Sequence, residues 1–336
     1  MAPLWIIGLC FLAGIVLRRL ALLPEDGARS LSGYVIYVAL PALVLLHVHD
    51  LQFRSALAFS ALMPHGVFAL AFLFFRILGK RKGWSKETIL CLTLTAGLGN
   101  TSFVGLPMIQ AFFGPQYLGI GVIIDQAGSF LALSTWGFAL LGYAGEGRPE
   151  SQPGQAPFAG EDPVDSAEKD SSARPSRPAG PGTLARIAKF PPFQALMLAL
   201  FLRPLDFPEE FREVLGSIGS SLTPVAMVAV GFQLRLSGLK HRILPLGAGL
   251  LFRLALAPVA ILTLAAFFFR QPGGLLPMSM QVTVFEAAMP PMITAGILAI
   301  DHGKDPELAA LMLGVGIPLS FLTLPAVHWI LQSGWL

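Results

Sequence analysis

The sequence carries little charge for its length. Only 13% of its 336 residues are Asp, Glu, Lys or Arg, whereas 54% are hydrophobic. A soluble domain carries about 25% charged residues. The shortage is deeper over most of the chain, because 13 of the 43 charged residues lie between residues 145 and 190. This composition argues against a soluble enzyme and indicates a protein that crosses a membrane several times.

Several other signals are missing. The two cysteines, Cys10 and Cys91, lie in apolar segments without a CxxC spacing, so we expect buried apolar side chains. The net charge of +3 is not gathered into a basic run with interleaved aromatics, so no nucleic-acid partner is expected. Residues 2–16 have the apolar core of a signal peptide, but no basic segment precedes them and no cleavage site follows. We therefore expect a retained first helix.

Long hydrophobic runs occupy most of the remaining sequence. A spanning helix needs about 20 mainly apolar residues. The sequence predicts an all-α polytopic membrane protein with ten transmembrane helices, at roughly residues 3–20, 29–49, 56–79, 87–113, 117–143, 187–204, 214–236, 244–269, 277–300 and 306–333.

The positive charges predict the orientation. With the N-terminus outside, the inward loops hold 18 of the 23 Lys and Arg residues, the outward loops hold four, and Arg253 lies within a span. Because cytoplasmic loops carry the excess of positive charge, this bias favours a multi-pass protein of the cytoplasmic (inner) membrane with both termini outside. Residues 145–186 are rich in Gly, Pro, Ser and mixed charge, and we expect them to form a disordered cytoplasmic linker.

The linker divides the ten predicted helices into two sets of five, residues 1–144 and 187–336. Pro41 and Pro224 differ by 183 positions, and so do Pro107 and Pro290. An odd number of helices in each half means that the second half enters the membrane from the opposite side. The sequence therefore predicts a five-plus-five inverted repeat, an arrangement found in secondary transporters.

Two of the predicted spans contain residues that interrupt helices. Residues 99–107 combine glycines, the polar run 100–102 and a proline, and residues 286–291 end in two prolines. An interruption exposes the N-terminus of a half-helix, whose N–H groups favour an anion. We expect the substrate-binding residues at these breaks, namely Asn100, Thr101, Ser102, Gly105, Pro107, Pro290 and Pro291, together with Arg253.

Three ionisable residues, Asp125, Arg253 and Glu286, fall well inside predicted spans, where an isolated charge costs at least about 2.5–3.5 kcal/mol. Glu286 could bind a coupling cation, H⁺ or Na⁺, or pair with Arg253. Asp125 could be a second coupling site or a helix–helix hydrogen bond. Arg253 could neutralise Glu286 or hold a substrate carboxylate. No cofactor is expected, and Glu286 could hold Na⁺.

The histidines have plainer interpretations. His65 follows a proline inside a predicted span, where a hydrogen-bonded structural role is weighed against a proton relay. His47, His49 and Asp50 have a spacing that could suit a metal, but we expect a solvated helix end.

At these residues the chain resembles the auxin efflux carrier family, which includes the plant PIN-FORMED carriers and bacterial organic-acid permeases. The resemblance extends over both halves and excludes only the linker. It is carried by Gly99–Met108 and Glu286–Pro291, with support from Leu40–Leu43, Ile317–Ser320 and Leu324–Pro325.

The resemblance implies a fold like the sodium/bile-acid symporters, with unwound helices 4 and 9 crossing and a transport unit that moves against helices 1, 2, 6 and 7. Members carry anionic acids, such as indole acetate in plants and malonate or malate in bacteria. The family's polar crossover position falls on Asn100. Where the plant carriers have a crossover asparagine in helix 9, this chain has Glu286 nearby, which resembles the cation-site carboxylate of the bile-acid relatives.

The expected function is therefore secondary active, elevator-type transport of a small mono- or dicarboxylate, coupled to H⁺ or Na⁺ through Glu286. Its expected partners are the organic anion and the lipid bilayer, and a homodimer is left open. The first alternative is a passive uniporter or channel on the same architecture. An intramembrane hydrolase is a weaker alternative, since no nucleophile–base pair or second facing aspartate accompanies Asp125. A receptor that signals through the linker is another weaker alternative.

Overall fold

A computed structural model describes residues 2–24, 26–51, 55–143, 187–234, 242–269 and 276–333. Every regular element in these ranges is a helix. The one β-type contact among them is an isolated bridge between two residues. The all-helical class is therefore confirmed for the described residues. The predicted linker, 145–186, lies outside them.

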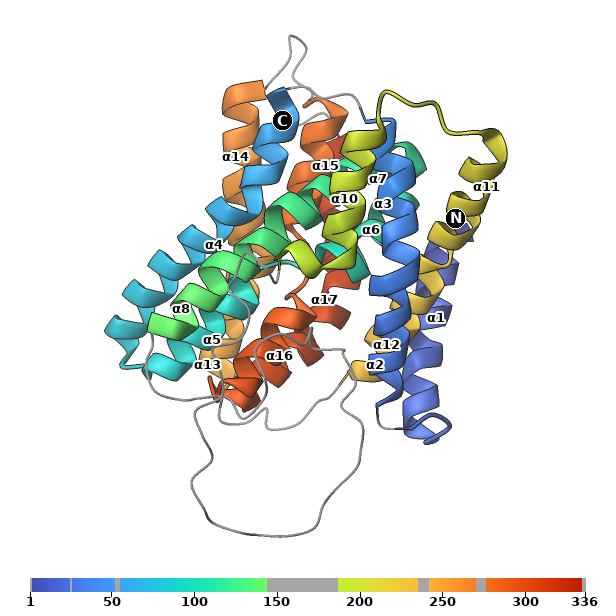
Figure 1. Cartoon of the computed structure of the whole chain (residues 1–336). Helices are drawn as coiled ribbons and strands as arrows, with labels where there is room; N and C mark the ends of the chain where they lie inside the picture. Colours follow the sequence, from blue (N-terminus) through green and yellow to red (C-terminus); the bar gives the residue numbers. More distant parts are fainter. Residues whose placement is uncertain are drawn as a thin grey trace, which may run out of the picture.

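The α-helices follow one another along the chain in the order of their labels (Figure 1). They are α1 (Ala2–Arg19), α2 (Gly27–Tyr34), α3 (Leu40–His49), α4 (Ser55–Lys82), α5 (Lys86–Gly97), α6 (Leu106–Phe112), α7 (Leu118–Ile123), α8 (Phe138–Tyr143), α10 (Pro191–Leu202), α11 (Glu209–Ser220), α12 (Leu222–Gln233), α13 (Ile243–Leu251), α14 (Ala257–Phe269), α15 (Met278–Ala287), α16 (Ile293–Asp301) and α17 (Pro306–Gln332).

Short π-helical segments join several of these helices without a turn. They are η1 (Val35–Ala39), η2 (Thr101–Gly105), η4 (Ile124–Phe130), η5 (Leu133–Gly137) and η7 (Phe252–Leu256), and a 3₁₀ turn, η3 (Pro115–Tyr117), precedes α7. Such wide turns often accompany functional positions in helices.

Helix is present in each of the ten predicted ranges. Six described segments are long and apolar enough to cross a membrane, namely Gly27–His49, Ala56–Lys82, Pro115–Leu141, Glu209–Gln233, Ile243–Phe269 and Pro306–Gln332. Shorter apolar helices occupy Thr101–Phe112 and Pro191–Leu202. The count of ten crossings stays a prediction.

The helices form two packed groups. In the first, which we call the small bundle, α1 and α2 pack on α12, and α3 packs on α10 and α11. The second, the large bundle, contains α4 to α8 and α13 to α17, with α4 against α5 and α16 against α17. The α1–α12 contact is close, because a Cβ at Gly14 would lie 2.8 Å from the backbone nitrogen of Phe232. Small residues permit such approaches between membrane helices.

The two ends of the molecule differ in charge. The end at which α1 meets α2 and α4 meets α5, here called the basic end, carries Arg18, Arg19, Lys80, Arg81 and Lys82. The first and last described helices have their free ends toward the opposite side, here called the termini end (Figure 1). This asymmetry matches the predicted loop charges, but the side of the membrane stays a prediction.

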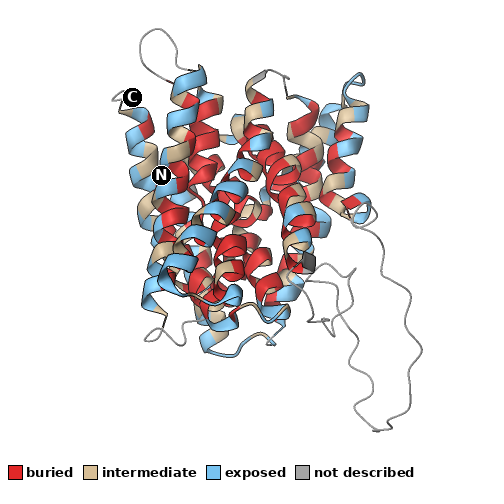
Figure 2. Cartoon of the chain, turned by 90° about the vertical axis from the view of Figure 1, so that its left-hand side faces the viewer, coloured by how far each residue is buried: buried red, intermediate tan, exposed pale blue. Residues whose placement is uncertain are grey.

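Buried residues fill the middle of the molecule, and exposed residues lie along its flanks and ends (Figure 2). The flanks include large apolar side chains such as Phe201, Phe267 and Leu322, which are 79%, 80% and 74% exposed. A water-soluble protein rarely exposes apolar patches of this kind. Cys91 is buried, as predicted, whereas Cys10 is only half-buried, and both are free thiols.

Candidate functional site

The two interrupted helices cross inside the large bundle. The backbone N–H of Asn100 donates to the carbonyl of Pro290 (2.8 Å), and that of Met292 donates to the carbonyl of Leu98 (3.0 Å). These bonds frame an antiparallel bridge between Gly99 and Pro291. Two segments about 190 residues apart thus satisfy each other's backbone groups, as a break within lipid requires.

The first interruption follows from residues 97–100. Helix α5 ends at Gly97, and Leu98 is extended, with φ −116° and ψ 130°. The side chain of Asn100 then caps the next segment, because its Oδ1 accepts the N–H of Phe103 at 3.2 Å. Its Nδ2 is buried without a hydrogen-bond partner in the described structure. The break thus leaves one buried amide group without a partner among the described residues.

The second interruption depends on proline. Helix α15 ends at Ala287, and the chain is non-helical until α16 begins at Ile293, so Pro290 and Pro291 both lie in the break. Pro107 does not behave in this way. It lies inside the continuous helix Thr101–Phe112, just after the π-helical turn of η2 and seven residues beyond Asn100. Pro107 and Pro290 therefore lie at different places relative to the two breaks, and the positions that meet are Gly99 and Pro291.

Asp125 is the centre of a buried polar cluster on the termini side of the crossing. Its Oδ1 accepts the hydroxyls of Thr101 (2.5 Å) and Ser102 (2.8 Å), and its Oδ2 accepts the Nε2 amide of Gln126 (2.6 Å). Asp125 is 2% exposed. Three donors hold the carboxyl group in place. Two of them are the hydroxyls of Thr101 and Ser102, the residues that follow Asn100.

Glu286 lies in the last turn of α15 and is fully buried. Neither of its carboxylate oxygens has a hydrogen-bond partner among the described residues. The carboxylate lies against the backbone of η2, because a Cβ at Gly105 would lie 2.6 Å from Oε2. A buried carboxylate without a donor is costly unless a proton or cation neutralises it.

A small cavity adjoins Glu286. Its volume is about 10 Å³ for a water-sized sphere, which is close to the minimum for one water molecule. Besides Glu286 it is lined by Gly97, Gly99, Thr101, Ser129, Arg253 and three residues of α4. The hydroxyl of Ser129 is also buried and unpartnered within the described part of the chain. The cavity therefore brings together oxygen atoms that lack partners.

Arg253 lies at the crossing and is 2% exposed. Its Nε donates to the carbonyl of Met289 (2.8 Å), and its Nη2 donates to the carbonyl of Ala287. Its Nη1 reaches the carbonyl of Ala96 at 3.4 Å. In the part of the chain that the structure describes, no ion pair within 4.0 Å joins Arg253 to Glu286. The guanidinium is thus directed at helix-end carbonyls.

His65 has a partner for each ring nitrogen. Its Nε2 lies 3.1 Å from the carbonyl of Ala127, and the indole N–H of Trp136 lies 3.2 Å from its Nδ1. A ring that accepts at Nδ1 must donate from Nε2, which is the neutral tautomer. The structural interpretation of His65 therefore fits better than a proton relay.

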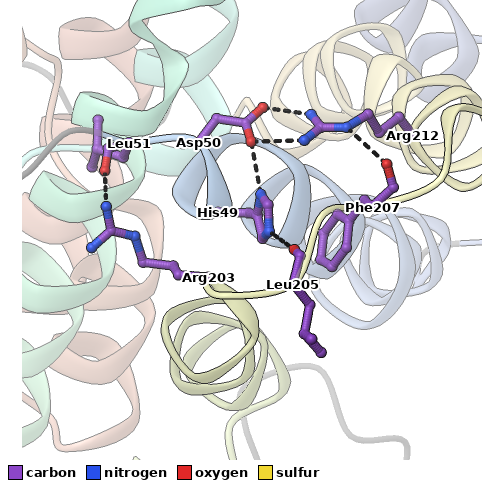
Figure 3. Close-up of polar contacts among 7 residues, drawn as sticks. All are labelled: His49, Asp50, Leu51, Arg203, Leu205, Phe207 and Arg212. Atoms are coloured by element: carbon purple, nitrogen blue, oxygen red, sulfur yellow. Dashed lines mark hydrogen bonds and ion pairs between the residues drawn. The ribbon is translucent and has the colours of Figure 1, made fainter.

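His49, the last residue of α3, belongs to a network that joins the end of α3 to α11 and to the chain between α10 and α11 (Figure 3). His49 contacts Asp50 and the carbonyl of Leu205, and Arg212 binds both carboxylate oxygens of Asp50 at 2.6 and 3.0 Å. The hydrogen bond from Arg212 is the main cause that lowers the pKa of Asp50 to about 2. No group of three or more His, Cys, Asp or Glu residues suited to a metal occurs among the described residues. The expected helix end is thus solvated at Asp50, whereas His49 is buried and stacks on Phe207.

A larger crevice opens at the basic end, between the two bundles. Its volume is about 680 Å³, and α1, α2 and α12 face α16 and α17 across it. Its walls are mainly apolar and include Ile293, the first residue of α16. Arg18, Arg29 and Asp26 are its charged lining residues. The crevice thus connects the basic end with the N-terminus of the second half-helix.

The structure brings together most of the expected site. Asn100, Thr101, Pro290 and Pro291 meet at the crossing, Asp125 and Gly105 lie beside it, and Pro107 lies beyond it. Ser129 and Gln126 were not expected from the sequence. Ser129 follows Asp125 by four residues, so both lie on one helix face, and that spacing was the available signal.

Comparison with known proteins agrees with this architecture. The sequence pattern of a family described as "Membrane transport protein" matches residues 1–328. An uncharacterized transporter from Methanothermobacter thermautotrophicus is 26% identical over 320 residues, which cover 94% of this chain and 92% of that protein. An uncharacterized transporter from Methanocaldococcus jannaschii is 23% identical over 332 residues, which cover 96% of each chain. The chain is thus a multi-pass membrane transporter, and it belongs to the membrane transport protein family that includes the auxin efflux carriers its motifs resemble.

Proposed function

We propose that this protein is a secondary active transporter of an organic acid anion, a small mono- or dicarboxylate, and that H⁺ or Na⁺ bound at Glu286 drives accumulation. The observation that carries the proposal is the crossing of two interrupted helices beside a buried carboxylate that has no hydrogen-bond partner among the described residues. In a transporter family, such a crossing is where substrate and coupling ion are expected.

Ten membrane crossings in a five-plus-five inverted repeat are part of the proposal. Arg18, at the end of α1, donates to the carbonyl of Leu234 just beyond α12 (2.8 Å). Arg203, just beyond α10, donates to the carbonyl of Leu51 just beyond α3 (2.9 Å). Leu51 and Leu234 differ by 183 positions, the offset of the first proline pair. These matched contacts support two halves of opposite orientation.

The chemistry around the two half-helix N-termini differs, and this supports separate places for cation and anion. The N-terminus of η2 lies beside Asp125 and Glu286, whose carboxyl groups suit a proton or Na⁺. The N-terminus of α16 borders the crevice, whose lining contains Arg18 and Arg29. We therefore propose that the substrate carboxylate binds at α16 and the amide of Asn100, with Thr101 and Ser102 on the cation side.

The division into two bundles supports an elevator motion. The crossing, with Asp125, Glu286 and Arg253, belongs to the large bundle. The hydrogen bonds of Arg18 and Arg203 join helices of the small bundle. The hydroxyl of Thr223 on α12 and the amide of Gln110 on α6 form a bond of 3.0 Å between the bundles. Sliding of the large bundle past α12 would carry the site from one face of the membrane to the other.

Coupling between the two ligands is electrostatic. A cation at Glu286 lowers the free energy of bringing an anion to the crossing, and by linkage the anion strengthens cation binding to the same degree. Without a cation, the unpartnered carboxylate would repel the substrate. The proposed cycle therefore requires both ligands to move together.

A thermal-shift screen of the purified protein tests binding. Carboxylates are added with and without Na⁺ over a pH series, because a ligand of the folded state raises its stability by mass action. We expect stabilisation by a carboxylate that increases with Na⁺ or with falling pH. A carboxylate that stabilises equally under all these conditions would contradict coupling.

Uptake into vesicles tests the role of Glu286. The Glu286→Gln variant should lose accumulation against a gradient while retaining some exchange, because a neutral amide cannot take up the cation. The exposed Glu210 on α11 supplies the matched control, Glu210→Gln, which should accumulate substrate like the parent. Unchanged accumulation in Glu286→Gln would sink the coupling role, and flux that is neither saturable nor cation-dependent in the parent would favour the uniporter or channel.

A further inference from the structure

One buried cation lies where the two interrupted helices cross. Arg253 comes from η7, between α13 and α14, and is not part of either interrupted helix. We propose that Arg253 is a positioning residue of the transport cycle. It fastens the ends of α5 and α15 to each other and keeps Glu286 without a permanent ion pair, ready for the coupling cation. This proposal rests on the function proposed above.

The fastening follows from the hydrogen bonds of the guanidinium. The last carbonyls of a helix have no partners within that helix and carry partial negative charge. The carbonyl of Ala96 belongs to the end of α5, and those of Ala287 and Met289 belong to the end of α15. The three bonds come from three separate nitrogens of one planar group, whereas a lysine ammonium would have to make them from a single nitrogen.

Gly99 leaves room for the guanidinium of Arg253. A Cβ at Gly99 would lie 3.0 Å from Nη2 of Arg253 and 3.3 Å from its Cζ. The guanidinium therefore lies directly against the bridged segment, and a side chain at Gly99 would push it away from the carbonyls. Because Gly99 has no side chain, the guanidinium of Arg253 can contact the ends of both α5 and α15. We call this set of contacts the clamp.

The charge of Arg253 also acts on Glu286. Both residues line the same small cavity, yet all three guanidinium nitrogens are bonded to carbonyls. Arg253 therefore attracts the carboxylate without donating a hydrogen bond to it. This attraction competes with the coupling cation, so the fixed positive charge weakens cation binding and makes release feasible.

Three other ionisable side chains lie within the helical segments that surround α15. They are Asp125 on η4, His65 on α4 and His328 on α17. Asp125 and His65 are hydrogen-bonded to protein groups, and the ring of His328 packs against Phe112 and Phe113. None of them provides a second guanidinium or ammonium group at the cavity. Removal of Arg253 should therefore change the affinity of Glu286 for the coupling cation.

Uptake by Arg253→Gln and Arg253→Lys variants separates charge from geometry. Each is titrated with Na⁺ at fixed pH and with protons in the absence of Na⁺. Arg253→Gln should lower the half-saturating concentration of the coupling cation by about tenfold, because a neighbouring opposite charge is lost. Arg253→Lys should leave that concentration unchanged. Both should have a reduced maximal rate and a lower melting temperature, because the three carbonyls lose their shared donor.

An unchanged half-saturating concentration in folded Arg253→Gln would overturn the proposal, since a purely structural residue would alter only rate and stability.

If Arg253→Gln does not fold, the Gly99→Ala variant tests the proposal instead. It should reduce the maximal rate without changing cation dependence, while Gly66→Ala, whose Cβ meets nothing within 4 Å, should behave like the parent. Normal uptake by Gly99→Ala would then refute the clamp. Absence of any cation-dependent uptake by the parent would refute the proposed function, and the melting temperature of Arg253→Lys would still test the clamp.

Discussion

The two interruptions at the crossing have the same outcome but different causes. The first uses a flexible and polar sequence, in which Gly97 and Leu98 end the helix and the side chain of Asn100 starts the next one. The second uses Pro290 and Pro291, which cannot donate backbone hydrogen bonds. The first break is therefore held by side-chain capping, and the second by backbone chemistry.

The polar groups are also distributed unequally about the two breaks. In the first, Asn100, Thr101 and Ser102 follow the break, whereas in the second Glu286 precedes it. Because the two helices run in opposite directions through the crossing, Thr101, Ser102 and Glu286 all come to lie on its termini side. The basic side is left with the N-terminus of α16 and apolar residues such as Ile293. An antiparallel crossing thus turns two unlike sequences into one site with a cation side and an anion side.

The largest effect is expected from removal of the proline break. In the double variant Pro290→Ala/Pro291→Ala, each substitution favours helix by about 3 kcal/mol, so α15 should extend through the crossing. The bonds from Asn100 and Met292 would then be lost. We expect transport to be abolished while the melting temperature, measured on purified protein, stays the same or rises.

The matched control for that variant is Pro325→Ala, because Pro325 is an exposed proline inside the continuous helix α17. It should transport like the parent. If the double variant also transports normally, the crossing does not depend on the prolines and the contrast between the two breaks is lost.

A smaller effect is expected from the polar break. Asn100→Ala removes the cap on Phe103, which costs about 1 kcal/mol, and also removes the free amide at the crossing. Asn100→Ser should retain the cap but not the amide. If the amide contacts the substrate, both variants should have a raised half-saturating substrate concentration, and only Asn100→Ala should also melt earlier. Equal substrate affinity in parent and Asn100→Ser would remove Asn100 from the anion site.

The smallest effect is expected far from the crossing, at the Asp50–Arg212 pair. Arg212 lowers the pKa of Asp50 to about 2 from an ordinary value of 3.8. A lowered pKa contributes stability that is present above the ordinary value and is lost as the pH falls toward 2. The melting temperatures of the parent and Asp50→Asn should therefore differ slightly at pH 7 and converge between pH 4 and 2. The pair is half-exposed, so solvent screening keeps the difference small.

Transport measured at pH 7 should be unaltered in Asp50→Asn, because the network of Figure 3 joins helices of the small bundle only. A strong loss of transport would mean that the small bundle contributes to the site, which contradicts the division into a static and a moving part.

Much of the architecture was determined by local sequence. Apolar runs, interrupted by polar turns, specify helices at predictable places, since buried backbone groups in lipid have few other solutions. The glycines and polar residues near Asn100 and the prolines at 290 and 291 likewise specify where helices stop. Asp125 and Glu286 were recognisable as site residues because charge inside an apolar run is costly.

Only the tertiary structure decided which groups meet. The pairing of Gly99 with Pro291, the placement of Pro107 within a helix and the turn of Arg253 toward carbonyls rather than toward Glu286 depend on how distant segments dock. A sequence pattern specifies that a helix end needs partners, but not which segment supplies them. That choice is made by packing in three dimensions, because hydrogen-bond partners must lie within about 3 Å regardless of their separation along the chain.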